Sequence, residues 1–120
     1  MALLTKEQIL NAEDITFEEI DVPEWSGTVR LKVMSGSERD SYEAAIYEIK
    51  GKDVRLNRDD MRAKLLARTL IDENGNRLFP DAEIRMLGKK SSKALDRLYE
   101  VAQRINGLSR EAVEDAEKNS

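Results

Sequence analysis

From about residue 15 onward, the spacing of the apolar residues changes once, near residue 35, and this change restricts the folds that the chain can adopt. Before that point apolar and polar residues alternate, most clearly from Val29 to Val33, which is typical of a β-strand with one buried face. Beyond it, apolar residues recur at the spacing of one face of an α-helix. We therefore expect an α+β fold: an N-terminal antiparallel β-hairpin at about 15–34, followed by a mostly helical bundle of four to five helices at about 36–117.

The expected hairpin has two strands joined by a turn at 23–27, which holds a proline and a glycine. In the first strand, 15–22, the apolar residues change parity, which predicts a bulge or bend near Glu18. On the outer face we expect acidic residues of the first strand to pair with Arg30 and Lys32 of the second.

Two capping boxes mark helix starts: Thr5 with Gln8, and Ser35 with Glu38. The first predicts a short helix at about 6–12. The second predicts a helix at about 36–50, with Gly51 just beyond its end. The inward stripe of this helix is Tyr42, Ala45, Ile46 and Ile49.

Further helices are expected at 58–71, at 80–88, at 91–106 and, short and frayed, from Ser109 onward. A polar connector at 52–57 precedes the first of these, and Asn57 is its expected N-cap. The helix at 91–106 has the most continuous apolar stripe: Leu95, Leu98, Val101, Ala102 and Ile105.

The composition favours a small binding protein over an enzyme. The 120 residues are enough for one domain, 1–120, which buries roughly two thirds of its surface on folding. The chain has no cysteine and no histidine, which excludes disulfides, thiolate ligands and the usual general base. No apolar run approaches the ~20 residues of a membrane span, and no secretory signal is visible. We expect a cytosolic domain without enzymatic activity, cofactor or metal.

Three short motifs with chemical potential each have a simpler structural interpretation. Asp72–Asn76 resembles part of a calcium loop, but its glycine is the fourth residue and not the sixth, so a plain turn is expected. Gly88-Lys89-Lys90 lacks the glycine spacing of a phosphate-binding loop and is expected to end a helix. The carboxylate pair Asp59-Asp60 is expected to lie on the solvated surface.

Charge is unevenly distributed along the chain. Residues 1–24 carry one cation and seven carboxylates, whereas 25–110 carry eighteen cations and thirteen carboxylates. The basic residues of 50–68 are interrupted by acidic ones and have no aromatic residue among them. A nucleic-acid-binding regulator is therefore the weakest hypothesis, and we expect neither a nucleic-acid nor a membrane partner.

Four apolar side chains are candidates for partner contacts: Trp25, Tyr47, Leu108 and Val113. Trp25 lies in the expected hairpin turn, where its ring either folds back as a core anchor or stands at the tip as a binding hot spot. Tyr47 faces away from Tyr42 on their expected common helix, which predicts that it is exposed. Leu108 and Val113 form either sticky contacts or a small satellite core.

Five segments form an ordered series: Leu4–Leu10, Val22–Val29, Ser35–Asp40, Asp72–Phe79 and the stretch from Leu95 to Leu108. In this order they resemble the tail assembly chaperones of long-tailed phages and prophages. The series spans nearly the whole chain, and its order carries the resemblance. Ser26 and Ser37 stand where glycine and alanine are commoner in the family, and Pro80 replaces a polar helix cap.

This resemblance implies a non-catalytic assembly factor of the host cytoplasm that is absent from the finished virion. Such a chaperone binds the tape measure protein and helps tail tube subunits to polymerise around it. In many phages a ribosomal frameshift produces a longer form whose extension recruits the tail tube protein. We further expect the domain to self-associate. The alternative is a structural connector or tube-associated subunit that stays in the virion.

Overall fold

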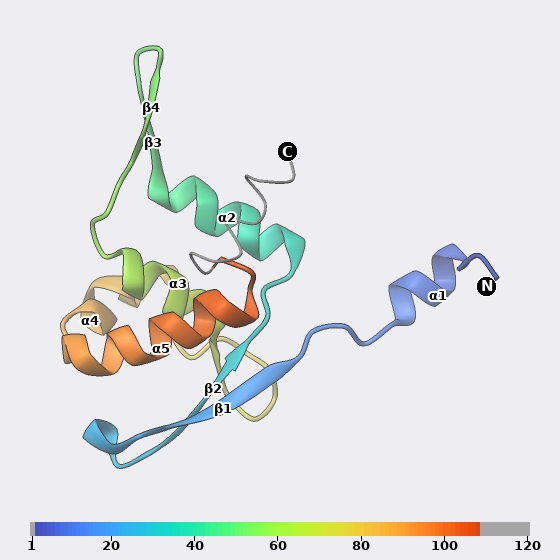
Figure 1. The fold of residues 1–120 in the computed structure, drawn as a ribbon, viewed down its shortest axis with the longest axis horizontal. Helices are drawn as coiled ribbons and strands as arrows, with labels where there is room; N and C mark the ends of the chain where they lie inside the picture. The colour runs from blue at the N-terminus through green and yellow to red at the C-terminus, as the bar shows by residue number, and fades with distance from the viewer. Residues whose placement is uncertain (1, 109–120) are drawn as a thin grey trace.

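A three-stranded antiparallel sheet and four α-helices form the body of the molecule, from which a helical arm and a second β-hairpin project (Figure 1). The computed structural model describes residues 2–108. The elements are α1 (Lys6–Asn11), β1 (Phe17–Val22), η1 (Pro23–Trp25), β2 (Gly27–Lys32), α2 (Gly36–Ile46), β3 (Tyr47–Lys50), β4 (Asp53–Leu56), α3 (Met61–Thr69), β5 (Leu70–Ile71), η2 (Asp81–Glu83), α4 (Ile84–Gly88) and α5 (Ser92–Ile105). The N-terminal hairpin and the helices after it confirm the expected α+β fold.

The three-stranded sheet has the order β1-β2-β5. β1 and β2 pair residue for residue over their whole length, so the bulge expected near Glu18 is wrong. The parity changes because Val22 is buried in the core while Phe17 lies on the outer face, where the Arg30 guanidinium stacks 4.6 Å from the ring centre. On the same face Arg30 lies 3.8 Å from the Glu19 carboxylate, which confirms the expected cross-strand charge pairing of Arg30. The pairing expected for Lys32 is wrong, because Lys32 lies opposite Phe17 and pairs with Glu38 of α2.

The helix expected at 36–50 ends at Ile46, and the chain continues into a second hairpin. β3 pairs with β4 across a turn at Gly51, whose φ is +62°. Gly51 is therefore not a helix cap, most of 52–57 is strand and not connector, and Ile49, expected in the buried stripe, is 78% exposed. The reason is that these residues also alternate apolar and charged side chains on both sides of a glycine, which favours a hairpin.

α3 is shorter than the helix expected at 58–71. It begins after Asp60, which adopts the left-handed conformation at φ +51°. Asn57, the expected N-cap, instead accepts a hydrogen bond from the backbone N–H of Asp59. The last two expected helical residues form β5, because antiparallel pairing with β2 satisfies their backbone groups while both side chains stay buried.

The helix starts at Lys6, Gly36 and Ser92 agree with the sequence, but the helix expected at 80–88 is divided into η2 and α4, and α4 begins only at Ile84. The capping boxes at Thr5 and Ser35 are both complete. Ser91 caps α5 by accepting a backbone N–H, and α4 ends at Gly88 as predicted. These caps satisfy N–H groups that the first turn of a helix leaves unpaired. The short helix expected from Ser109 lies outside the described residues.

α3 lies at the centre of the packing. It contacts α2, α4, α5 and β2, and six of its nine residues are buried. α5 presents the predicted apolar stripe, with Leu95, Leu98 and Ala102 buried and Val101 and Ile105 half-buried. The sheet adds Val22 and Leu31, and α2 adds Tyr42 and Ile46.

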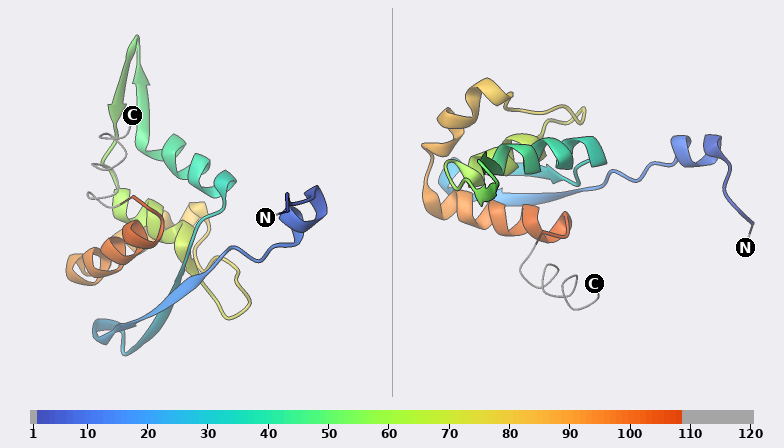
Figure 2. Two further views of the ribbon diagram at one scale, coloured as in Figure 1. Left: turned by 45° about the vertical axis from the view of Figure 1, so that its right-hand side comes forward. Right: turned by 90° about the horizontal axis from the view of Figure 1, so that it is seen from above.

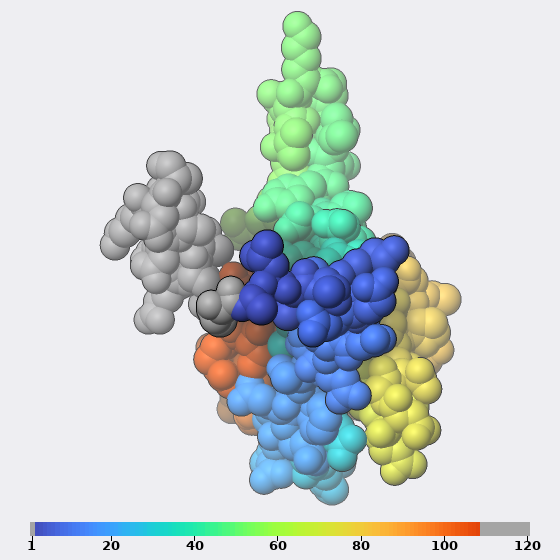
Figure 3. Space-filling view, turned by 90° about the vertical axis from the view of Figure 1, so that its right-hand side faces the viewer, coloured from blue at the N-terminus to red at the C-terminus, as the bar shows by residue number. Residues whose placement is uncertain are grey.

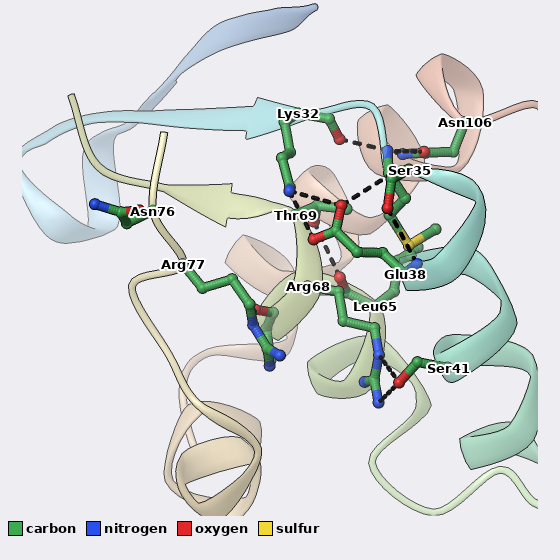
Figure 4. A network of polar contacts seen from close by, with 12 residues as sticks. Lys32, Ser35, Glu38, Ser41, Leu65, Arg68, Thr69, Asn76, Arg77 and Asn106 are labelled. Carbon is green, nitrogen blue, oxygen red and sulfur yellow. Dashed lines mark hydrogen bonds and ion pairs between the residues drawn. The ribbon is translucent and has the colours of Figure 1, made fainter. Parts of the chain in front are cut away.

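A polar network joins β2, α2 and α5 at the edge of the core (Figure 4). Lys32 Nζ lies 2.7 Å and 2.6 Å from the two carboxylate oxygens of Glu38. Burial acts to raise the pKa of Glu38, but hydrogen bonds from Lys32 and from the Ser35 backbone outweigh it and hold that pKa below its ordinary value. Asn106, just after α5, accepts the Met34 N–H at 2.7 Å. The network therefore fixes the turn between β2 and α2 against the end of α5.

Candidate interaction surfaces

The N-terminal arm, residues 2–16, is exposed at every position. It comprises α1 and an extended linker, and it stands clear of the body (Figures 1 and 2). α1 forms because its capping box satisfies two backbone N–H groups, although isolated helices of this length are marginal in water. Four aliphatic side chains of the arm are each more than half exposed: Leu3, Leu4, Ile9 and Leu10. The arm therefore offers apolar surface to a second molecule.

The hairpin of β3 and β4 projects from another part of the body and forms a narrow spike (Figure 3). One face is apolar: Tyr47 opposite Leu56 and Ile49 opposite Val54. The other face is charged: Glu48 opposite Arg55 and Lys50 opposite Asp53. All residues of both strands are exposed. Because a lone two-stranded hairpin is marginally stable in water, its apolar face is suited to being covered.

Two adjoining hollows of about 290 Å³ each open at the base of this face. They share Leu56, Met61 and Tyr99. The first is also lined by Tyr42, Ile46, Tyr47, Gln103 and Leu108, and the second extends to Arg58 and Arg62. We call the two hollows and the apolar face of the hairpin together the hairpin groove.

The lining of the hairpin groove is apolar and aromatic, with two cations and no carboxylate. Arg62 pairs with Asp96 of α5, whereas Arg58 forms no ion pair with the described part of the chain. Burial raises the pKa of Tyr42 above its ordinary value, so its hydroxyl stays protonated. The groove can therefore hold apolar side chains at one end and an acidic group at the other.

The structure places three of the four predicted contact residues, and it places them in different settings. Tyr47 lies on β3 and not on a helix; it is exposed, as expected, and meets half-buried Leu108 in the first hollow. Trp25 lies in η1 and is not among the residues that line the groove. Val113 lies outside the described residues. A role of these four side chains in binding remains a prediction.

Trp25 is half-buried and packs against the hydrophobic core, in agreement with its interpretation as a core anchor. The residue before it, Glu24, fixes its position, because the Glu24 carboxylate accepts a hydrogen bond of 2.7 Å from Arg97 of α5. The turn of the N-terminal hairpin is thus fastened to the last described helix.

Sequence reasoning missed the residues that complete the groove: Ile49, Val54 and Leu56. A signal for them exists, because 47–56 alternates apolar and charged residues around Gly51. The exposure of the arm had no such signal. Its leucines and isoleucine are arranged as in any short amphipathic helix that packs on a core.

Asp72–Asn76 forms a turn, as expected, and the carboxylate pair Asp59-Asp60 is exposed, also as expected. Asp72 Oδ1 accepts the backbone N–H groups of Asn74 and Asn76 at 2.8 Å and 2.9 Å, which closes a turn in which Gly75 has φ +84°. Within residues 2–108, no three side chains of the metal-binding types gather closely enough to hold an ion. In the same range, no helix has the length and hydropathy of a bilayer-crossing segment.

The basic segment 50–68 is partly engaged within the fold. Arg68 is buried, and it donates to the Ser41 hydroxyl at 3.1 Å and to the Lys64 carbonyl at 2.8 Å. Burial lowers the pKa of its guanidinium from the ordinary value. With Arg62 paired to Asp96, the segment presents fewer free cations than its sequence contains.

The chain is similar to known proteins over most of its length. The sequence model of the family described as phage tail assembly chaperone matches residues 5–119. Among solved structures, the chain resembles the bacteriophage HK97 tail assembly chaperone with a TM-score of 0.57, over 80% of this chain and 88% of that chain, at 20% identity. At this identity the likeness concerns the fold. No curated protein sequence matches the chain at a significant level.

Proposed function

The chain belongs to the phage tail assembly chaperone family, and on this premise we propose that it binds the tape measure protein and promotes assembly of the tail tube around it. The observation that carries the proposal is that apolar side chains are displayed on two elements outside the core, the N-terminal arm and the hairpin groove. A long, largely helical tape measure protein exposes apolar stripes until the tube covers them. A chaperone with such surfaces shields these stripes during assembly.

Co-expression with the tape measure protein of the same phage tests the proposal. The tagged chain is expected to co-purify with the tape measure protein and to increase its soluble fraction, relative to the tag alone. Absence of both effects would reject the proposed function. The measurement is the amount of tape measure protein in the soluble and bound fractions.

The proposal has further parts. The chain acts as one domain in the host cytoplasm, without catalysis, and a longer frameshifted form recruits the tail tube protein. The chaperone dissociates from the tail before the virion is complete. Mass spectrometry of purified particles is expected to find the tape measure and tube proteins but not this chain; its presence there at stoichiometric level would instead identify a connector or tube-associated subunit.

We also propose that the domain self-associates through its N-terminal arm. The support is that all residues of the arm are exposed, so its aliphatic side chains gain nothing from the body of their own chain. Contact with a neighbouring copy buries them.

A further inference from the structure

The hairpin groove has the dimensions and charge of a site for an amphipathic helix. We propose that it binds a helix of the tape measure protein, at least three turns long, whose aliphatic stripe is flanked by acidic side chains. This inference rests on the function proposed above and adds to it the surface used and the kind of segment recognised.

The shape of the groove sets the length of its occupant. The apolar face of the hairpin begins in the first hollow, at Tyr47 and Leu56, and continues to Ile49 and Val54, about 7 Å farther along the strands. A helix of three turns is about 16 Å long and can place one stripe of side chains along the hairpin and into the hollows. Tyr42, Tyr47 and Tyr99 line this path, and tyrosine is enriched where proteins meet.

The charge of the groove determines which charged side chains its occupant carries beside the aliphatic stripe. The cations of the lining, Arg58 and Arg62, lie in the second hollow, and neither hollow has a carboxylate in its lining. Arg62 has a partner in Asp96, so Arg58 is the cation available to a ligand. Acidic side chains beside the aliphatic stripe complement this end of the groove.

The N-terminal arm of a second copy fits the groove less well. α1 has six residues and spans about 9 Å, which is close to the length of the apolar hairpin face and leaves little helix to enter the hollows. Such a short helix covers either the hairpin or the hollows, but not both. A longer helix from another protein satisfies the whole surface.

Two double variants with matched chemistry test the proposal. I49Q/V54Q removes a cross-strand apolar pair from the groove side, and E48Q/R55Q removes the neighbouring charged pair from the opposite side. Both leave the net charge unchanged and alter only exposed positions. I49V/V54I keeps the face apolar and controls for hairpin formation. Affinity for the tape measure protein is measured by titration.

We expect I49Q/V54Q to weaken binding about tenfold or more, while E48Q/R55Q and I49V/V54I stay within about twofold of the wild type. Equal binding by all variants, with a binding wild type, overturns the groove assignment and leaves the proposed function standing. A wild type that does not bind rejects the proposed function, and this inference with it. A loss of self-association in I49Q/V54Q without loss of tape measure binding assigns the groove to a second copy and also overturns the proposal.

Arg58 tests the charge part separately. Arg58→Glu is expected to weaken binding about fivefold and to make the remaining affinity less sensitive to salt, whereas Arg58→Lys stays within about twofold. An unchanged affinity in Arg58→Glu contradicts an acidic flank.

Discussion

Arg97 of α5 holds Glu24, at the turn of the N-terminal hairpin, through two parallel hydrogen bonds: 2.7 Å from Nη1 to Oε1 and 2.9 Å from Nη2 to Oε2. This bidentate geometry is the strongest arrangement of an arginine and a carboxylate. The hydrogen bonds from Arg97 lower the pKa of Glu24 from 4.5 to about 2. The pair joins residues 73 positions apart and anchors the hairpin beside Trp25.

The depressed pKa predicts a pH dependence of stability. A carboxylate whose pKa is lower in the folded state stabilises the fold above its unfolded pKa, and this contribution is lost as the pH falls toward the folded pKa. We expect the Tm of Glu24→Gln to lie below that of the wild type above pH 4.5, and the difference to shrink as the pH falls from 4.5 toward 2. Thermal melts followed by circular dichroism across this range measure it. A difference that does not change with pH contradicts the assignment.

Asn106 predicts a large effect from a small polar side chain. Its Oδ1 accepts the Met34 N–H at 2.7 Å and its Nδ2 donates to the Ala102 carbonyl at 2.8 Å. Asn106→Ala leaves the partly buried Met34 N–H without its partner and is expected to cost about 1–3 kcal/mol of unfolding free energy. Asn74→Ala, at an exposed turn position, is the control and is expected to stay within about 0.5 kcal/mol. Urea denaturation decides between them, and equal effects contradict the role of Asn106.

Ser26 predicts a stabilising substitution. It adopts the left-handed conformation, with φ 55° and ψ 39°, at the turn between β1 and β2. The left-handed conformation of a non-glycine residue lowers the free energy of unfolding by about 1–2 kcal/mol, and glycine removes this strain. Glycine also makes the unfolded chain more flexible, which offsets part of the stabilisation. Ser26→Gly is therefore expected to raise the unfolding free energy by about 0.5–1 kcal/mol. Ser26→Ala, which keeps the strain, must show no such gain in the same urea titration.

Because the arm is exposed, we expect its removal to reduce self-association without changing the stability of the fold. Deletion of residues 2–12 removes only exposed side chains, so the unfolding free energy is expected to change by less than about 0.5 kcal/mol. The molar mass of the assembly, from light scattering after size exclusion, is expected to fall by more than the mass of the deleted residues, because fewer copies associate. I9Q/L10Q should reproduce this fall, whereas K6Q/E7Q, which also preserves net charge, should not. An unchanged mass after deletion would exclude the arm as the contact.

Local signals in the sequence predicted the parts of the fold that local chemistry determines. Alternation placed the N-terminal hairpin, and capping residues such as Ser35 and Ser91 placed helix starts, because both depend on near neighbours. The end of α2 was mispredicted because Ile49 fits the helical stripe of Tyr42 and the strand alternation around Gly51 equally well. β5 has only two residues, too few to produce an alternating pattern in the sequence. Its pairing with β2 depends on tertiary contact alone.

The candidate site was predicted only as single residues. Tyr47 was expected to be exposed, and Leu108 was expected to form either a partner contact or part of a small satellite core. That both line one hollow depends on where α2 ends and on how α5 packs against α3. Met61 and Tyr99 complete the hollow from two more elements. Such a convergence of distant segments has no periodic signature in a single chain.

The linker that joins α1 to β1 limits how the arm can act. Five residues, 12–16, separate the two elements and reach at most about 17 Å when fully extended. As a tether of this length, the linker keeps α1 at a high effective concentration close to the start of β1 and out of range elsewhere. The arm is thus built to prolong an encounter that has already brought a neighbour to this spot, and not to capture a distant molecule from solution.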